Sequence, residues 1–266
     1  MKTRGSPVTE SARQPWRGLI TLIEREYYRF GRLAGQTIAP PIISTLLFIV
    51  IFGYSLGQRI ENVAGFSYIL YILPGLIAMS VMNNAFSNSS TSLYMARIDR
   101  SLENIMVSPL SHFEIVASFV IGGLTRGLVV GGTTLLIGVL AAGLKIHSLV
   151  GTFASLALIS ILFSSLGILS ALWAEDWDHI ATFTNFVLTP LAYLGGIFYA
   201  VDLLPPLWQR LSWFNPLFYL VDCFRGQVLG VSAVRPAHSF LLLTLLALGS
   251  LLFSVHLFRR GWKIIH

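Results

Sequence analysis

The chain of 266 residues is too apolar for a water-soluble protein of its size. Hydrophobic residues make up 55% of it and charged residues only 11%, against about 25% charged residues in an ordinary soluble domain, and the mean hydropathy is +0.73. The single cysteine, Cys223, excludes an intramolecular disulfide framework and a multi-cysteine metal site. The formal net charge of +6 fits either a nucleic-acid-binding protein or a membrane protein with a basic cytoplasmic side, so the distribution of the charges decides.

The N-terminal region divides into a polar tail and an amphipathic segment. Residues 1–15 are polar and lack an apolar run, so we expect a disordered cytoplasmic tail there. In the segment 16–34, apolar residues follow helical spacing and arginines occupy the other faces. The apolar residues are Trp16, Leu19, Ile20, Ile23, Tyr27 and Phe30. This spacing predicts an amphipathic helix lying in the membrane interface. An ordinary surface helix of a soluble domain is the alternative.

Long stretches without Asp, Glu, Lys or Arg follow this segment. A helix needs about 20 residues to cross the hydrocarbon core, and a chain in lipid must satisfy its own backbone hydrogen bonds. The sequence therefore predicts an all-α, polytopic membrane protein whose permease domain covers 37–258. Six transmembrane helices are expected near 37–57, 68–93, 114–142, 149–173, 180–200 and 238–258.

The lysines and arginines predict the orientation of these spans. With six spans, twelve of the 18 basic residues lie on the side of the termini, five on the opposite side, and one, Arg126, inside the third span. Because lysine and arginine favour cytoplasmic segments, we expect both termini to be cytoplasmic, with 259–266 as a basic tail. The positive charge is then accounted for by the membrane, and no nucleic-acid partner is expected.

Residues 201–235 are apolar in short runs but do not predict a crossing. Arg210, Asp222 and Arg225 interrupt the runs, and prolines divide them further. A crossing here would also move the C-terminal basic residues to the outside. We expect two short helices that dip into the outer leaflet and return, with aromatic residues at the interface.

No enzymatic motif is present in the sequence. It contains no G-x-x-x-x-G-K-[ST] phosphate loop, no G-x-S-x-G elbow and no H-E-x-x-H pair. The densest polar cluster, Asp176 to His179, has the residue types of a metal site, but it falls in a short loop between predicted spans, where solvated charge is normal. We expect no enzyme activity and no cofactor in this chain.

Residues 97–108 predict a short amphipathic helix on the cytoplasmic side. Ser108 and Pro109 end it, and Ser111 with Glu114 forms a capping box that opens the third span. Such a helix either presents a face to a partner protein or rests on the bilayer. Its apolar positions at helical spacing are Ile98, Leu102, Ile105 and Met106.

The second predicted span carries a polar face. Amides are costly in lipid and normally face protein or water, so this face either lines a hydrated path or forms hydrogen bonds between helices. Its members at spacings of three and four are Asn83, Asn84, Ser87, Asn88 and Thr91. Aromatic residues of the fifth span, among them Phe183, Phe186 and Tyr193, would suit an amphipathic substrate.

The third predicted span combines small residues with a charge. Gly123, Gly127 and Gly131 form a doubled G-x-x-x-G, which permits another helix to approach closely. Arg126 lies beside them and needs a carbonyl or acidic partner, or access to water.

The C-terminal half carries a long motif that resembles the signature of the permeases of the second ABC exporter type. Its residues here are Leu188, Leu191, Leu194, Gly195, Ile197, Leu204, Pro205, Pro216, Leu217, Tyr219 and Arg225. The runs FVLTPLAYLGGIFY and LLPP are similar to those of Gram-negative inner-membrane permeases of the nodulation-factor exporter kind. The resemblance covers nearly the whole chain.

The resemblance implies a permease subunit in a bacterial inner membrane. It would pair with a second copy of itself and with two separate cytoplasmic ATPase subunits, which would bind the ATP and Mg. The expected ATPase-coupling residues are Arg97, Ile98, Arg100, Leu102, Glu103, Ile105 and Met106. The candidate translocation path consists of Asn83, Asn84, Ser87, Asn88, Thr91, Phe183, Phe186 and Tyr193. The expected outer gate consists of Pro205, Trp208, Pro216, Tyr219 and Arg225.

Two hypotheses about the function follow. The first is an ATP-driven exporter of an amphipathic substrate such as a lipid, a lipo-oligosaccharide, a polysaccharide or a drug. The alternative is a self-sufficient secondary transporter or channel. Against the alternative, no acidic residue lies inside a predicted span beyond Glu114, the first residue of the third span, whereas proton or cation coupling usually needs one.

Overall fold

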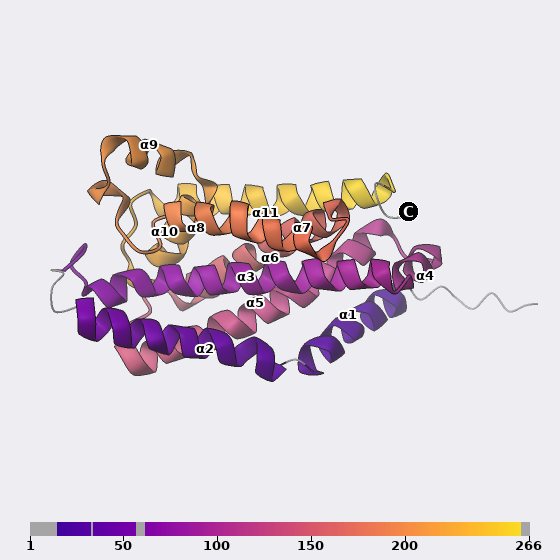
Figure 1. Ribbon diagram of the computed structural model, residues 1–266, viewed down its shortest axis with the longest axis horizontal. Helices are drawn as coiled ribbons and strands as arrows, with labels where there is room; N and C mark the ends of the chain where they lie inside the picture. The colour runs from indigo at the N-terminus through magenta and orange to yellow at the C-terminus, as the bar shows by residue number, and fades with distance from the viewer. Residues whose placement is uncertain (1–14, 33, 57–61, 262–266) are drawn as a thin grey trace, which may run out of the picture.

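The described part of the chain is a bundle of helices. The computed structural model describes residues 15–32, 34–56 and 62–261. Within these ranges the regular elements are all helical, apart from an isolated bridge between Val63 and Phe66. The long helices run along the long axis of the molecule (Figure 1). The predicted all-α class is confirmed.

The first half of the chain forms most of the long helices. Its elements are α1 (Pro15–Arg32), α2 (Ala34–Val50), the π-helical η1 (Ile51–Leu56), α3 (Tyr68–Ile98), α4 (Ser101–Val107), α5 (His112–Ala142) and α6 (Leu149–Trp173). The second half forms shorter pieces and one long helix. These are α7 (Trp177–Phe183), the π-helical η2 (Thr184–Leu188), α8 (Thr189–Leu194), the 3-10 turn η3 (Val201–Leu203), α9 (Pro206–Phe214), α10 (Pro216–Leu229) and α11 (Pro236–Arg259).

Five helices among the described residues are long and apolar enough to cross a membrane. They are Ala34–Gly53, Tyr68–Ile98, His112–Ala142, Leu149–Trp173 and Pro236–Arg259. The predicted fifth span, 180–200, is not one of them. α7, η2 and α8 follow one another there, and the last helical residue is Leu194. Pro190 has no N–H to donate to the preceding turn, and the wide π-helical turn comes directly before the helical piece that contains it.

α3 and α6 form the centre of the bundle. They pack against each other, α5 packs against both, and α11 covers α6. Gly123 and Gly127 of α5 lie against Ser164 and Ser160 of α6 so closely that an added Cβ would collide with them. The predicted close approach at the doubled G-x-x-x-G is therefore confirmed, and it lies within one chain.

The two ends of the bundle carry different structures. α4, the beginning of α1 and the end of α11 lie together at one end, whereas α9 and α10 lie at the other (Figure 1). The predicted tail 1–15 lies outside the described residues except for Pro15, which begins α1. The predicted tail 259–266 begins with the last residue of α11, Arg259, and its residues 262–266 lie outside the described part.

The start of α5 is fixed by the predicted capping box. The Ser111 hydroxyl accepts a hydrogen bond from the Glu114 backbone N–H at 3.2 Å, and the Glu114 carboxylate accepts one from the Ser111 N–H at 2.7 Å. This reciprocal pair satisfies two backbone donors that the first helical turn leaves without partners. The capping box is confirmed and sets the turn between α4 and α5.

Candidate functional site

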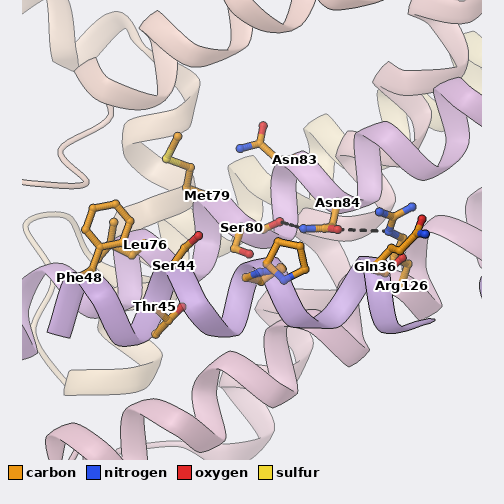
Figure 2. A pocket seen from close by; sticks show the side chains of 13 residues that line it. Gln36, Ser44, Thr45, Phe48, Leu76, Met79, Ser80, Asn83, Asn84 and Arg126 are labelled. Atoms are coloured by element: carbon orange, nitrogen blue, oxygen red, sulfur yellow. Dashed lines mark hydrogen bonds between the residues drawn. The ribbon is translucent and has the colours of Figure 1, made fainter. Parts of the chain in front are cut away.

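A cavity of about 410 Å³ lies between α2 and α3, and Arg126 of α5 stands at one end of it (Figure 2). Gln36 and Asn84 lie near Arg126, whereas Phe48 and Leu76 lie at the other end, with Ser44 and Thr45 close to Phe48 (Figure 2). The other lining residues are Thr37, Pro40, Pro41, Met79, Ser80 and Asn83.

Arg126 has an amide partner on the neighbouring span. Its Nε donates to Oδ1 of Asn84 at 3.2 Å, and Asn84 in turn donates from Nδ2 to the Ser80 carbonyl at 3.0 Å (Figure 2). The sequence indicates that Arg126 needs a carbonyl, an acid or water, and the structure provides a carbonyl oxygen of a side-chain amide. Asn84 therefore positions this arginine beside the cavity.

A second cavity, also of about 410 Å³, lies on the other side of α3. Ser87 and Thr91 of α3 line it opposite Thr184 and Asn185 of the segment between α7 and α8. Asn83 lines both cavities. The polar face of α3 thus borders two cavities.

The aromatic residues of the predicted path separate into two groups. The ring of Phe183 stacks on Phe86 of α3, with the centroids 5.7 Å apart, next to the second cavity. In contrast, Phe186 is 78% exposed, and Tyr193 is also exposed. Neither side chain lines one of the two cavities. Tyr193 lies against Phe198, with the ring centroids 5.7 Å apart. The place of Phe186 and Tyr193 in the translocation path stays a prediction.

Asn88 lines neither of these two cavities and belongs to a buried network with α1. Nη2 of Arg29 donates to Oδ1 of Asn88 at 3.0 Å and forms an ion pair with Glu26 at 2.9 Å. Glu26 is buried and also accepts a 2.5 Å hydrogen bond from the Ser92 hydroxyl. This network joins α1 to the polar face of α3. Sequence reasoning missed it, although Glu26 lies seven residues after Leu19 and three after Ile23, on the apolar face of α1.

The expected coupling helix 97–108 is shorter than predicted and is turned differently. α3 continues to Ile98, Arg100 adopts a left-handed conformation, and α4 begins at Ser101. Leu102 and Ile105, which were expected to face a partner, are only 1% and 8% exposed and pack into the core. The expectation for these two residues is wrong, because the chain reverses at Arg100 and lays the apolar side of α4 against the bundle.

Other residues of this segment form its free surface. Val107 is 88% exposed, and Ile98, Arg100 and Glu103 are exposed as well. Arg97 donates to the carbonyls of Ala171 and Ala174 at the end of α6, at 2.6 and 3.0 Å, so it fixes the end of α3 rather than pointing outward. Met106 is half-buried and packs against the core.

The segment 201–235 is organised around two buried charged residues. Arg225 donates from Nη2 to the Gly196 carbonyl at 2.6 Å and from Nε to the Tyr71 carbonyl at 3.2 Å. Asp222 accepts from the backbone N–H groups of Ala233 and Val234 at 2.7 and 3.2 Å. Arg225 is therefore not a solvated loop residue, since it ties α10 to the first turn of α3.

The remaining residues of the predicted outer gate lie at the surface of this segment. Pro205 stands directly before α9, and Trp208 is exposed on it. Pro216 begins α10, and the Tyr219 hydroxyl donates to the Trp213 carbonyl at 3.0 Å. α9 thus displays its aromatic residues outward while α10 is buried against α3 and α6.

The cluster from Asp176 to His179 serves a local structural purpose. Nδ1 of His179 accepts hydrogen bonds from the backbone N–H groups of Glu175 and Asp176, at 3.2 and 3.4 Å. The imidazole thereby caps the start of α7. Across the described ranges no group of three or more His, Cys, Asp or Glu side chains is placed to hold a metal ion.

Comparison with known proteins decides the family. The model of the ABC-2 type transporter family matches residues 17–229, which include both cavities, α4 and α9–α10. This chain is an ABC-2 permease. The resemblance found in the C-terminal motif is confirmed.

Relatives of this ABC-2 permease match it over most of their length. The inner membrane transport permease YadH of Escherichia coli K12 is 39% identical over 246 residues, which cover 92% of this chain and 96% of YadH. Nodulation protein J of Rhizobium leguminosarum bv. trifolii is 27% identical over 215 residues, covering 79% of this chain and 81% of that protein. Nodulation protein J of Neorhizobium galegae is 24% identical over 212 residues. This permease is therefore a membrane subunit of the transporter class rather than an enzyme.

Proposed function

We propose that this ABC-2 permease is the membrane subunit of an ATP-driven exporter in a bacterial inner membrane. The observation that carries the proposal is the pair of polar-lined cavities flanking α3 in a chain of this transporter family. YadH, which is similar over nearly its whole length, is named an inner membrane transport permease. Because the sequence has no phosphate-binding loop, the ATP and Mg would be bound by separate ATPase subunits.

The proposed topology has six crossings. The consecutive pieces from Trp177 to Leu194 form an 18-residue helical segment, which is about 27 Å long at 1.5 Å per residue and so nearly spans a core of about 30 Å. With this segment as the fifth crossing, α4 and both ends of the described chain lie on the cytoplasmic side. α9 and α10 then form a re-entrant hairpin in the outer leaflet, because neither is long enough to cross.

The ATPase would dock at the cytoplasmic end of the bundle. The segment 97–108 would still be the docking segment, but the surface in contact with the ATPase would be its exposed side. This side is formed by Ile98, Arg100, Glu103 and Val107. Leu102 and Ile105 would transmit its movement, since they join α4 to the core. Two copies of the chain and two ATPases would form the exporter, and ATP binding would favour one of two arrangements of the spans.

The substrate would be an amphipathic molecule such as a lipid, a lipo-oligosaccharide, a polysaccharide or a drug. The two cavities support this, because each combines amide and hydroxyl groups with apolar side chains. Asn83, which borders both, would contact the substrate on either side of α3.

Reconstitution into proteoliposomes tests the proposal. The purified chain is measured alone and together with an ABC ATPase subunit that copurifies with it, using headgroup-labelled lipids and hydrophobic dyes as probes. We expect ATP hydrolysis and ATP-dependent transport only when both subunits are present. ATP hydrolysis by the pure permease, or transport driven by an ion gradient without the ATPase, would overturn the proposal and favour a self-sufficient transporter.

A further inference from the structure

Arg126 presents unused hydrogen-bond donors to the cavity between α2 and α3. A guanidinium carries five N–H donors in a rigid fork. Within the described part of the chain the Arg126 side chain makes one hydrogen bond, from Nε to Asn84, and its terminal nitrogens Nη1 and Nη2 make none. A charge placed among membrane helices is expensive unless it meets a partner or water. The free side of this guanidinium is therefore available to a ligand.

The charge balance at this end of the cavity favours an anion. The residues lining the cavity include no Asp and no Glu. Glu26 on α1 is held by Arg29 and Ser92. Arg29 binds Asn88, one helical turn from the Asn84 that holds Arg126, and the charge of Arg29 is balanced by Glu26. Among the described residues Arg126 itself has no carboxylate partner, so a negative charge beside it would be stabilised.

The length and lining of the cavity indicate that a ligand bound to Arg126 would also have an apolar part. Gln36 lies near Arg126 and Phe48 at the opposite end (Figure 2). Gln36 and Phe48 are twelve residues apart on α2, or about 18 Å along the helix axis. Phe48, Leu76 and Met79 offer an apolar wall at the far end. Lining residues such as Gln36 and Ser44 are themselves exposed, so the cavity is open to the surroundings of the bundle.

We propose that this cavity binds an anionic amphiphile, with a phosphate or carboxylate on the guanidinium of Arg126 and an apolar chain along Phe48, Leu76 and Met79. Arginine suits this task because its fork pairs with two oxygens of one anionic group. Asn84 holds the guanidinium in place and is a positioning residue. The inference narrows the substrate class of the proposed exporter. That the bound amphiphile is the transported substrate rests on the proposed function.

Binding to the purified permease in detergent tests this inference without an ATPase. The probes are a long-chain alkyl phosphate, an alkyl phosphocholine with the same chain, and inorganic phosphate, and bound molecules are counted by native mass spectrometry. We expect the alkyl phosphate to bind and the other two to bind at least about tenfold more weakly. Arg126→Gln should weaken alkyl phosphate binding by about tenfold to a hundredfold, the effect of losing one charge-assisted hydrogen bond.

Two control variants separate the site from general charge and folding effects. Arg210→Gln makes the same charge change at an exposed position on α9 and should leave binding unchanged. Ser44→Phe keeps the charge but places a large side chain in the cavity near Phe48, where the apolar chain would lie, and it should also weaken binding of the alkyl phosphate (Figure 2). If Arg126→Gln fails to fold, Ser44→Phe carries the test.

Several results would overturn the inference. The first is equal binding of the alkyl phosphate by Arg126→Gln and Arg210→Gln. The second, if Arg126→Gln does not fold, is alkyl phosphate binding that Ser44→Phe leaves unchanged. The third is alkyl phosphocholine binding as tight as that of the alkyl phosphate. Inorganic phosphate binding as tightly as the alkyl phosphate would mean a free-anion site instead. Because no ATPase takes part, a failure here leaves the exporter proposal standing, and a failure of ATP-dependent transport leaves the binding result intact.

Discussion

The guanidinium of Arg225 lies over the ring of Tyr71, 4.2 Å from its centroid. The same side chain reaches the Gly196 carbonyl, so one arginine connects α10, the beginning of α3 and the loop after α8. These contacts come from segments 154 and 29 residues away in the chain. Arg225 thus anchors α10 to a core helix, α3.

Replacing Arg225 by lysine should destabilise the permease. A lysine keeps the charge but cannot reach the carbonyls of Tyr71 and Gly196 together while stacking on a ring. We expect a loss of about 2–3 kcal/mol, because buried acceptors lose their donor. The measurement is the apparent Tm from the fraction of monodisperse protein remaining after heating, since unfolding of such a protein is irreversible. Arg210→Lys, at an exposed site, is the control, and equal stability of both variants would contradict the anchoring role.

Two glycine-to-alanine changes should shift stability in opposite directions. A Cβ on Gly167 of α6 would lie 2.5 Å from the Phe86 backbone carbonyl oxygen of α3, whereas one on Gly132 of α5 meets nothing within 4 Å. Gly167→Ala should cost about 1–3 kcal/mol through overpacking. Gly132→Ala should stabilise by up to about 1 kcal/mol, because alanine is the better helix former. The same heating assay compares them, and a neutral Gly167→Ala would show that α3 and α6 separate easily.

The positions of the long helices were predictable from the sequence because lipid imposes one simple requirement on them. A run such as 149–173 without charges has to be a helix, and α6 occupies that range. Which face of a helix packs against the bundle was not predictable in the same way. The spacing of Leu102 and Ile105 indicates an apolar face but not what covers it, and the left-handed turn at Arg100 directs this face inward.

The candidate site was predictable in composition rather than in partners. Asn83, Asn84, Ser87 and Thr91 do line the cavities, because amides and hydroxyls on a spanning helix are placed where they avoid lipid. The pairing of Asn88 with Arg29 brings together residues 59 positions apart, and no local pattern encodes such a contact.

Removing the Glu26 carboxylate should loosen α1 from the bundle. In Glu26→Gln, Arg29 loses its ion-pair partner and Ser92 loses a charged acceptor, which should cost about 1–3 kcal/mol. Hydrogen exchange followed by mass spectrometry should then show faster exchange of the α1 amides. Glu24→Gln changes an exposed residue of the same helix and should leave the exchange as it is. If both variants exchange like the unaltered protein, the network does not hold α1 in place.

Charge substitutions at α4 should separate folding from docking. Val107→Asp places a charge on an exposed side chain, so the permease should fold normally but bind the ATPase subunit more weakly, by about tenfold or more. Leu102→Asp puts an unpaired charge in the core and should abolish the folded protein. Size-exclusion chromatography reports folding, and affinity for the ATPase subunit reports docking. Unchanged affinity in Val107→Asp would move the docking surface away from α4.

Cysteine accessibility should decide the position of α9 and α10. The only native thiol, Cys223, is buried and is replaced by serine first. Gly230 is an unsuitable labelling site, because its φ of +77° favours glycine and a Cβ there would lie 3.2 Å from the His147 ring. Single cysteines at Leu203, Gln209 and Ala233 avoid both problems, and Ala233→Cys keeps the backbone N–H that donates to Asp222. In intact cells a membrane-impermeant thiol reagent should label all three, because the proposed hairpin enters and leaves the membrane on the outer side. Labelling of the Ala233 variant only after the inner face is exposed would mean that the segment crosses, and the cytoplasmic position of both termini would then be wrong.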